Sequence, residues 1–197
     1  LRIGPEILKG VADSYRRLRN TMRFMLGSLS DYDVSDETVS NEMPELERWV
    51  LHRLCELDEK VQQGYDSYDF QGVFQAIFTF ATVDLSSFYF DIRKDVLYCD
   101  GDTIERRSAR TVLNLLFHRL TTWLAPILVF TMEEVWLERY PDKDNSVHLV
   151  DIPNTPSEWR DDKLAKKWSI VRSYRRLVTS ALELSLIHIS EPTRPST

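Results

Sequence analysis

The chain has 197 residues, of which 43% are hydrophobic and 11% aromatic, so it can bury a sizeable core and is not a disordered chain. Only six residues are glycine, which favours long helices over a fold rich in tight turns. The formal net charge of −6 argues at first against a nucleic-acid partner, and the longest apolar run, Trp123 to Phe130, is too short for a bilayer span of about 20 residues.

The start of the sequence, its cysteines and its histidines indicate what kind of protein the chain comes from. No initiator methionine or signal peptide opens it, and its first residues resemble mid-protein sequence, which predicts a fragment. Cys55 and Cys99 lie far apart and form no CxxC motif, so no disulfide framework is indicated and a reducing compartment is the simplest interpretation. The four histidines are scattered, at positions 52, 118, 148 and 188, and we predict no metal site.

Two helices are predicted in the first third of the chain. The first runs from about Pro5 to Leu29, because proline suits a first turn and because an apolar stripe repeats at helical spacing. This stripe comprises Tyr15, Leu18, Met22, Met25, Leu26 and Leu29. Residues 30–43 are polar and acidic without periodicity. The second helix starts near Pro44, and its stripe comprises Leu46, Trp49, Val50, Leu54, Leu57, Val61 and Tyr65, with Arg53 at the edge.

A third helix is predicted after Asp69, whose carboxylate can accept hydrogen bonds from the free N–H groups of a first turn. Its main apolar stripe comprises Phe70, Val73, Phe74, Ile77, Phe78, Ala81, Leu85, Phe88 and Ile92. Further aromatic and aliphatic residues lie on its other faces. Because a helix that is apolar nearly all round is buried, we expect this helix to form the core of the domain.

The remaining elements complete an all-α pattern. Asp102 or Thr103 can cap a fourth helix, which Pro126 must kink or end because proline lacks an N–H. A short helix over Ile127 to Tyr140 and a last helix from about Ser157 to Leu184 follow. The inward residues of the last helix are expected to be Leu164, Trp168, Val171, Val178 and Leu182. No segment alternates long enough for a strand, so the predicted fold is an all-α bundle of about five helices.

The negative net charge hides two basic segments. Residues 1–30 hold six Arg and Lys against two carboxylates, a net charge of +4, and residues 160–176 hold seven against two, a net charge of +5. The acidic excess is concentrated in residues 31–60. Two basic segments in an acidic protein can form one face directed at a polyanion. The alternative is that both are solvated helix faces.

Four polar residues of the first helix form what we call the arginine ridge: Arg16, Arg19, Asn20 and Arg23. At 100° per residue they share an arc of about 100° beside the apolar stripe. Guanidinium groups offer a planar fork of donors for phosphates and can stack on bases, so the ridge is a candidate RNA-binding site. In the last helix, Lys163, Lys167 and Arg175 are the candidates that would assist it. The alternative is that the ridge arginines pair with Asp31, Asp33, Asp36 or Glu37, or pack inward.

No residue pattern indicates catalysis. Asp84 lies on the apolar side of the third helix and needs a partner there, for which Arg53 is a structural candidate. Glu133 and Glu134 are expected to be exposed or capping residues instead of an acid/base pair. We find no nucleophile–base constellation, phosphate-cradling glycine loop or metal cluster.

Four segments resemble, in order, the helical anticodon-binding domain of class I isoleucyl-tRNA synthetases. They are SYRRLRNTMRFMLGSL (Ser14 to Leu29), the stretch from Tyr68 to Tyr98, WLAPILVFTMEEVW (Trp123 to Trp136) and SVHLVDIP (Ser146 to Pro153). The resemblance covers about residues 3–184. The SYRRLRNT string favours the isoleucine enzyme over its valine, leucine and methionine relatives.

The resemblance implies a module that binds the anticodon stem-loop of tRNA(Ile), within a cytoplasmic, monomeric enzyme that charges this tRNA with isoleucine. ATP with Mg is implied for that parent enzyme, and no cofactor or membrane contact for this segment. The sequence lacks the HIGH and KMSKS signatures, the editing domain and the cysteine-rich zinc segment of many bacterial members, so no catalytic residue is expected. Two alternatives stay open: an α-helical protein-interaction domain and the same domain of a valine-type synthetase.

The last residues depart from the resemblance. After Leu184 the family would continue a charged helix, whereas this chain continues with SLIHISEPTRPST. That string has two prolines and no amphipathic period, and it resembles a translated cloning or adapter sequence. We therefore expect a helical domain over residues 1–184 and a non-native tail over residues 185–197, which we exclude from functional reasoning.

Overall fold

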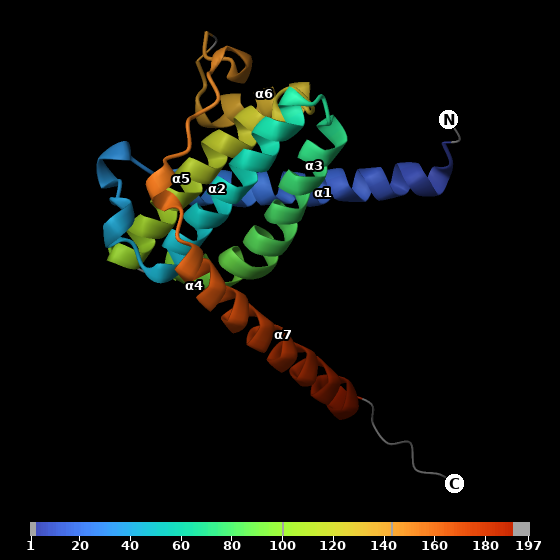
Figure 1. Cartoon of the computed structure of the whole chain (residues 1–197), viewed down its shortest axis with the longest axis vertical. Coiled ribbons are helices and arrows are strands. Elements are labelled where there is room, and N and C mark those ends of the chain that lie inside the picture. Colours follow the sequence, from blue (N-terminus) through green and yellow to red (C-terminus); the bar gives the residue numbers. More distant parts are fainter. Residues whose placement is uncertain (1–2, 100, 143, 191–197) are drawn as a thin grey trace. The chain divides into compact units, whose positions relative to one another are not determined.

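The computed structural model describes residues 3–99, 101–142 and 144–190, and these fall into two compact units that divide after Arg160. The first unit contains the α-helices α1 (Pro5–Ser28), α2 (Glu45–Asp66), α3 (Phe70–Thr79), α4 (Phe90–Cys99), α5 (Ile104–Leu124) and α6 (Val129–Arg139). Figure 1 shows these helices gathered into a bundle. Among the described residues there is no strand, so the predicted all-α class is confirmed.

The helix boundaries follow the capping and proline signals closely. Pro5 occupies the first turn of α1. The Asp69 carboxylate accepts from Gly72 N at 2.9 Å, and Thr103 Oγ1 accepts from Arg106 N at 3.2 Å. Helix α5 ends at Leu124, immediately before Ala125 and Pro126. Each predicted cap or break in these places is thus confirmed, with Thr103 and not Asp102 capping α5.

The predicted third helix is continuous but not regular. Between α3 and α4 the chain forms the π-helical segment η3 (Phe80–Tyr89). Two serine hydroxyl groups there form hydrogen bonds at the five-residue spacing of a π-helix. Ser86 Oγ donates to the carbonyl of Ala81 and Ser87 Oγ to that of Thr82, each across five residues. By length and composition alone, the helix from Phe70 to Cys99 could cross a membrane, with a mean hydropathy of 1.3, but half of that window is buried inside the protein.

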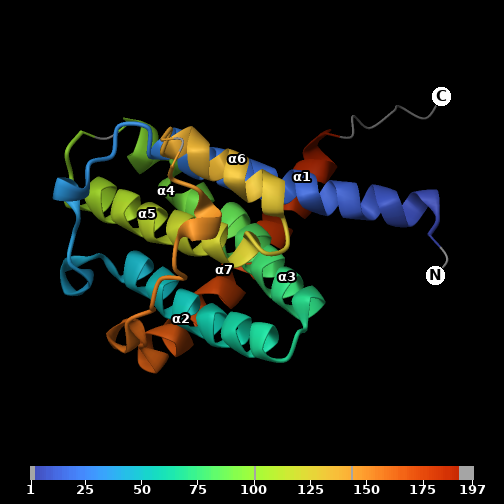
Figure 2. The same ribbon diagram turned by 90° about the horizontal axis from the view of Figure 1, so that it is seen from above.

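The core lies on α5, and the expectation that the third helix forms it is only partly correct. Helix α5 packs against α1, α2, α4 and α6, as the two views of the bundle show (Figures 1 and 2). Its fully buried side chains include Val112, Leu113, Leu116, Phe117, Leu120 and Trp123. In the third helix, by contrast, Phe70 and Ile92 are exposed while Phe74 and Phe78 are half-buried. These four side chains lie at the rim of the core, whereas Ile77, Ala81 and Leu85 of the same helix are fully buried, so the third helix shares the core with α5.

A buried ion pair ties α2 to the third helix. The Glu47 side chain is fully buried, and Arg93 donates to both of its carboxylate oxygens at 2.7 Å, with Tyr89 Oη donating at 3.1 Å. Burial raises the pKa of Tyr89 well above its usual value. A second pair links Arg53 Nη2 to the buried Asp84 at 3.2 Å, which confirms the structural partner predicted for Asp84.

The second unit, Asp161–Thr197, consists in its described part of α7 (Asp162–Ser190). Val171, Val178 and Leu182 are exposed on α7, so they do not form the inward stripe expected of them. The helix also continues six residues beyond Leu184, which the tail boundary at residue 185 did not foresee. Residues 191–197 lie outside the described residues, and the non-native origin of residues 185–197 stays a prediction.

Candidate functional site

The arginine ridge occupies the exposed side of α1. Leu18, Met22 and Met25 bury the opposite side against the bundle, and this fixes the rotation of the helix about its axis. Arg16, Arg19, Asn20 and Arg23 are consequently all exposed. The structure therefore confirms that the four side chains share an accessible face. Figure 2 shows that the first half of α1 extends beyond the other helices of its unit.

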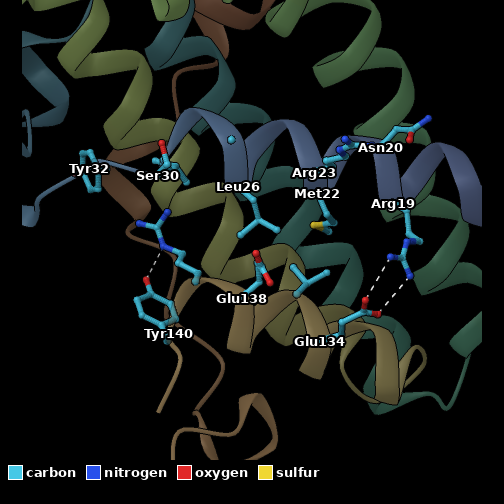
Figure 3. Close-up of a pocket in the computed structure, with 14 residues that line it drawn as sticks. Arg19, Asn20, Met22, Arg23, Leu26, Ser30, Tyr32, Glu134, Glu138 and Tyr140 are labelled. Atoms are coloured by element: carbon cyan, nitrogen blue, oxygen red, sulfur yellow. Dashed lines mark hydrogen bonds and ion pairs between the residues drawn. The ribbon is translucent and has the colours of Figure 1, made fainter. Parts of the chain in front are cut away.

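The ridge borders a groove between α1 and α6 of about 770 Å³. Arg19, Asn20 and Arg23 line it from α1, whereas Glu134 and Glu138 line it from α6. Figure 3 shows Arg19 turned toward Glu134 and Asn20 pointing away from it. The α1 wall is thus basic, and the α6 wall carries two carboxylates and, next to Tyr140, the guanidinium of Arg139. A polyanion would be attracted to the outer face of α1 and repelled by the part of the α6 wall that carries Glu134 and Glu138, whereas Arg139 lines the groove farther along.

Arg19 is the ridge residue with the most contacts. Its guanidinium donates to Glu134 at 3.3 and 3.4 Å and to Tyr15 Oη at 3.2 Å. The hydrogen bond that Arg19 donates to Tyr15, followed by the one it donates to Glu134, raises the pKa of Arg19. Tyr15 also shares a hydrogen bond with Thr131 at 3.0 Å, which lowers the tyrosine pKa. Because both Arg19 and Glu134 are about half exposed, the ion pair is worth under about 1 kcal/mol and can be exchanged for another anion.

The other ridge residues form fewer hydrogen bonds and ion pairs within the protein. Arg16 pairs with Asp13 at 3.0 Å on the helix surface, with its side chain 70% exposed. Asn20 and Arg23 form no hydrogen bond or ion pair within the described ranges. Among the side chains that the structure describes, the ridge arginines do not pair with Asp31, Asp33 or Glu37, and Asp31 pairs instead with Arg110 at 2.7 Å. The Asp36 side chain lies outside the described ones, so that part of the alternative stays open.

Glu133 and Glu134 of α6 contact different parts of the bundle. Glu133 accepts hydrogen bonds from Ser146 Oγ at 2.9 Å and Val147 N at 3.0 Å, and so holds the start of the short helix Val147–Leu149. Glu134 pairs with Arg19. Neither geometry resembles an acid/base pair acting on a common substrate atom. In the described part of the chain, no three His, Cys, Asp or Glu side chains are grouped for a metal ion.

The predicted cations of the last helix lie in the second unit. Lys163 and Lys167 are four residues apart on α7, and Arg175 follows two turns later, so the three share an arc of about 120°. By helical geometry the three residues therefore lie on one side of α7. The proposal that these residues act together with the ridge remains a prediction.

An aromatic cluster that the sequence did not reveal includes Tyr140, which lines the groove. His118 shares a hydrogen bond with Tyr140 Oη at 2.8 Å, and its ring contacts those of Phe117 and Trp136. Burial, followed by the positive charges of Arg139 and Arg119, lowers the pKa of His118 to about 4. The signal available in the sequence was a histidine next to the apolar stripe of α5, which does not specify its partners.

The depressed pKa of His118 predicts a pH-dependent stability. The neutral ring is favoured in the folded state, so the stabilisation is complete above the unfolded pKa of about 6.5 and is lost as the pH falls toward 4. The loss should reach about 2–3 kcal/mol. Urea unfolding at several pH values, compared with His118→Gln, measures it. Identical pH profiles for the two proteins would contradict the assignment.

Comparison with known proteins adds a family to this geometry. The family model described as "Anticodon-binding domain of tRNA ligase" matches residues 47–192. The chain is 72% identical over 184 residues to the isoleucine–tRNA ligase of Ruegeria pomeroyi, 53% identical to that of Brucella abortus and 51% identical to that of Agrobacterium fabrum. Each match covers 93% of this chain and 19% of the relative, so the chain spans about a fifth of the length of these relatives.

Proposed function

The chain belongs to the family of anticodon-binding domains of tRNA ligases, and from that premise we propose that it grips the anticodon stem-loop of tRNA(Ile). The observation that carries the proposal is the arginine ridge, in which three guanidiniums and an amide lie exposed on one face of α1. Because Glu134 and Glu138 line the groove beside the ridge, the exposed arginines suit a partner that approaches α1 from outside the bundle. Contacts with RNA phosphates would set the position of the RNA, and contacts with unstacked loop bases would give sequence specificity.

The proposal extends to the parent enzyme. We infer that the chain is part of an isoleucine–tRNA ligase of the cytoplasm, which acts as a monomer and charges tRNA(Ile) with isoleucine using ATP and Mg. The support is the identity to named isoleucine–tRNA ligases along nearly the whole chain. We assign no catalytic, ATP-binding or metal-binding residue to this segment. Its contribution is to hold one end of the tRNA.

The ridge proposal predicts a separation between affinity and stability. Arg16→Ala and Arg23→Ala should each weaken binding of the tRNA(Ile) anticodon stem-loop, while thermal unfolding changes little because both side chains are exposed. Each lost phosphate contact should make the slope of log affinity against log salt shallower by about 0.7–0.9. A constant slope with weaker preference for the cognate loop would instead indicate contacts with bases. Filter binding at several salt concentrations makes the measurement.

Arg17→Ala is the matched control, since Arg17 is exposed on the same helix but points away from the ridge. It should leave affinity and salt slope close to wild type. Single alanine substitutions of Lys163, Lys167 and Arg175 test whether α7 contributes to RNA binding. A large fall in melting temperature for Arg16→Ala or Arg23→Ala, with unchanged affinity of the folded fraction, would show that the ridge is structural.

A further inference from the structure

A cluster of arginines surrounds Tyr32 at the opposite end of the α1–α6 groove from Arg19. The guanidinium of Arg110 lies 5.4 Å from the centre of the Tyr32 ring, and that of Arg139 lies 5.9 Å from it. Arg106 is the third member, through Asp31, to which both Arg106 and Arg110 are ion-paired at 4.0 and 2.7 Å. We call Arg106, Arg110 and Arg139 the Tyr32 cluster. Figure 3 shows Ser30, Tyr32 and Tyr140 together at this end of the groove.

The charges of the Tyr32 cluster are not balanced. Within the described residues, Asp31 is the carboxylate that forms ion pairs with two of its guanidiniums, those of Arg106 and Arg110. Arg139 donates only to neutral acceptors, Tyr140 Oη at 2.9 Å and Asn114 Oδ1 at 2.7 Å. His118 is buried beside Tyr140 and, with a pKa of about 4, is neutral near pH 7. Glu138 lines the same groove without an ion pair to the cluster in these parts of the chain.

Two nitrogen atoms of the cluster lack a hydrogen-bond acceptor. Nε of Arg110 and Nη1 of Arg139 are buried and have no partner among the described residues. The side chain of Arg110 is only 6% exposed, so its position is fixed by the fold. Leaving a buried charged donor unsatisfied costs free energy, and a native protein accepts this cost where a ligand supplies the missing acceptor.

The surroundings of the cluster favour an anion with several oxygen acceptors. Arg139 is held in place by the rings of Tyr32, Phe117 and Tyr140, so little side-chain entropy would be lost on binding. Arg106 is a quarter exposed and can reach solvent, whereas Asp31 is 70% exposed and therefore only a weak, displaceable partner. A phosphate group offers the forked acceptors that guanidiniums bind most strongly.

We propose that the Tyr32 cluster is a binding site for a backbone phosphate of the RNA, in which the phosphate takes the place of Asp31. This site rests on the proposed function and adds to it a second contact, separate from the arginine ridge. Together the two sites would hold the RNA backbone at both ends of the α1–α6 groove. Asp31 would then act as a stand-in for the phosphate in the free protein.

The test compares salt-dependent binding of the anticodon stem-loop by the full chain and its variants. Arg106→Gln and Arg139→Gln should each weaken binding roughly three- to tenfold and make the salt slope shallower by about 0.7–0.9. Asp31→Asn should act in the opposite direction and strengthen binding, because it removes the competing carboxylate. Melting temperatures of all variants show that folded proteins are compared.

Two matched controls distinguish a built site from a general basic surface. Arg107→Gln removes an exposed arginine next to Arg106 that pairs with Asp102 instead of Asp31, and Asp33→Asn removes a nearby carboxylate outside the cluster. Both should leave affinity within about twofold of wild type. Effects as large as those of Arg106→Gln and Asp31→Asn would overturn the proposal.

A second arm uses inorganic phosphate as the probe in thermal unfolding. Stabilisation by phosphate that Arg139→Gln removes, together with the changed RNA slope, supports a phosphate site used by RNA. The same stabilisation with an unchanged RNA slope would overturn the proposal, since the cluster would then bind only small anions. If wild type binds RNA through the ridge but the cluster variants behave as wild type, this inference fails alone. If wild type binds no RNA, the proposed function fails as well.

Discussion

Replacing Arg93 by Ala should lower the free energy of unfolding by about 3–5 kcal/mol, because it leaves the charge of Glu47 buried without a cation. The Glu47 side chain is fully buried and accepts both bonds of the Arg93 guanidinium, so the substitution removes the cation that compensates this carboxylate. Only the hydroxyl of Tyr89 would remain as a donor. Urea unfolding followed by circular dichroism measures the loss.

The control for this prediction is Lys94→Ala, which breaks an exposed ion pair with Asp91 on the same helix and should cost at most about 1 kcal/mol. The double variant Glu47→Leu with Arg93→Met removes both charges and should recover much of the stability lost in Arg93→Ala. A loss in Arg93→Ala no larger than that of Lys94→Ala would mean that Glu47 is not buried as an ion in solution.

A second large effect is expected in the core of α5. Phe117→Ala should destabilise the protein by about 3–5 kcal/mol, because the ring is fully buried among α5 and α6 side chains and its removal leaves a cavity. Phe78→Ala should cost clearly less, about half as much, since Phe78 is half-buried on the rim of the bundle. Equilibrium unfolding of the two variants under the same conditions makes the comparison.

The comparison tests which helix forms the core. If Phe78→Ala costs as much as Phe117→Ala, the third helix is as central as its apolar composition first indicated. Leu116→Ala, at the neighbouring fully buried position, serves as a second probe of α5 and should lose about 2–5 kcal/mol. Leu116→Ala reports the loss of packing alone, whereas Phe117→Ala also removes the contact between the Phe117 ring and the Arg139 guanidinium.

Local signals in the sequence predicted the helices well. Caps, prolines and apolar stripes are properties of a few consecutive residues, and for this reason Asp69, Thr103 and Pro126 marked boundaries that the structure contains. The centre of the bundle was harder to predict, because composition does not say which helix the others surround. Helix α5 carries buried Arg110 and Arg119 and several threonines, which made it look less apolar than the third helix. The π-helical segment η3 was likewise not predicted.

The grouping of residues in the candidate site could be predicted only where they lie on one helix. The ridge residues of α1 share a face by helical geometry, so the sequence alone was enough to group them. The pairing of Arg19 with Glu134 joins residues 115 positions apart, and the Tyr32 cluster joins α1, α5 and α6 through the loop that follows α1. Contacts of that kind depend on how helices pack, which periodicity does not specify.

The central claim is that this domain recognises an isoleucine tRNA by its anticodon stem-loop. The most direct measurement is the dissociation constant of the 197-residue chain for the isoleucine anticodon stem-loop and for a hairpin with the same stem and the valine loop. We expect the chain to prefer the isoleucine loop by roughly tenfold or more, equivalent to about 1.4 kcal/mol. Arg16→Ala and Arg23→Ala should reduce this preference. Equal affinity for the two hairpins, or binding that neither substitution alters, would contradict the central claim.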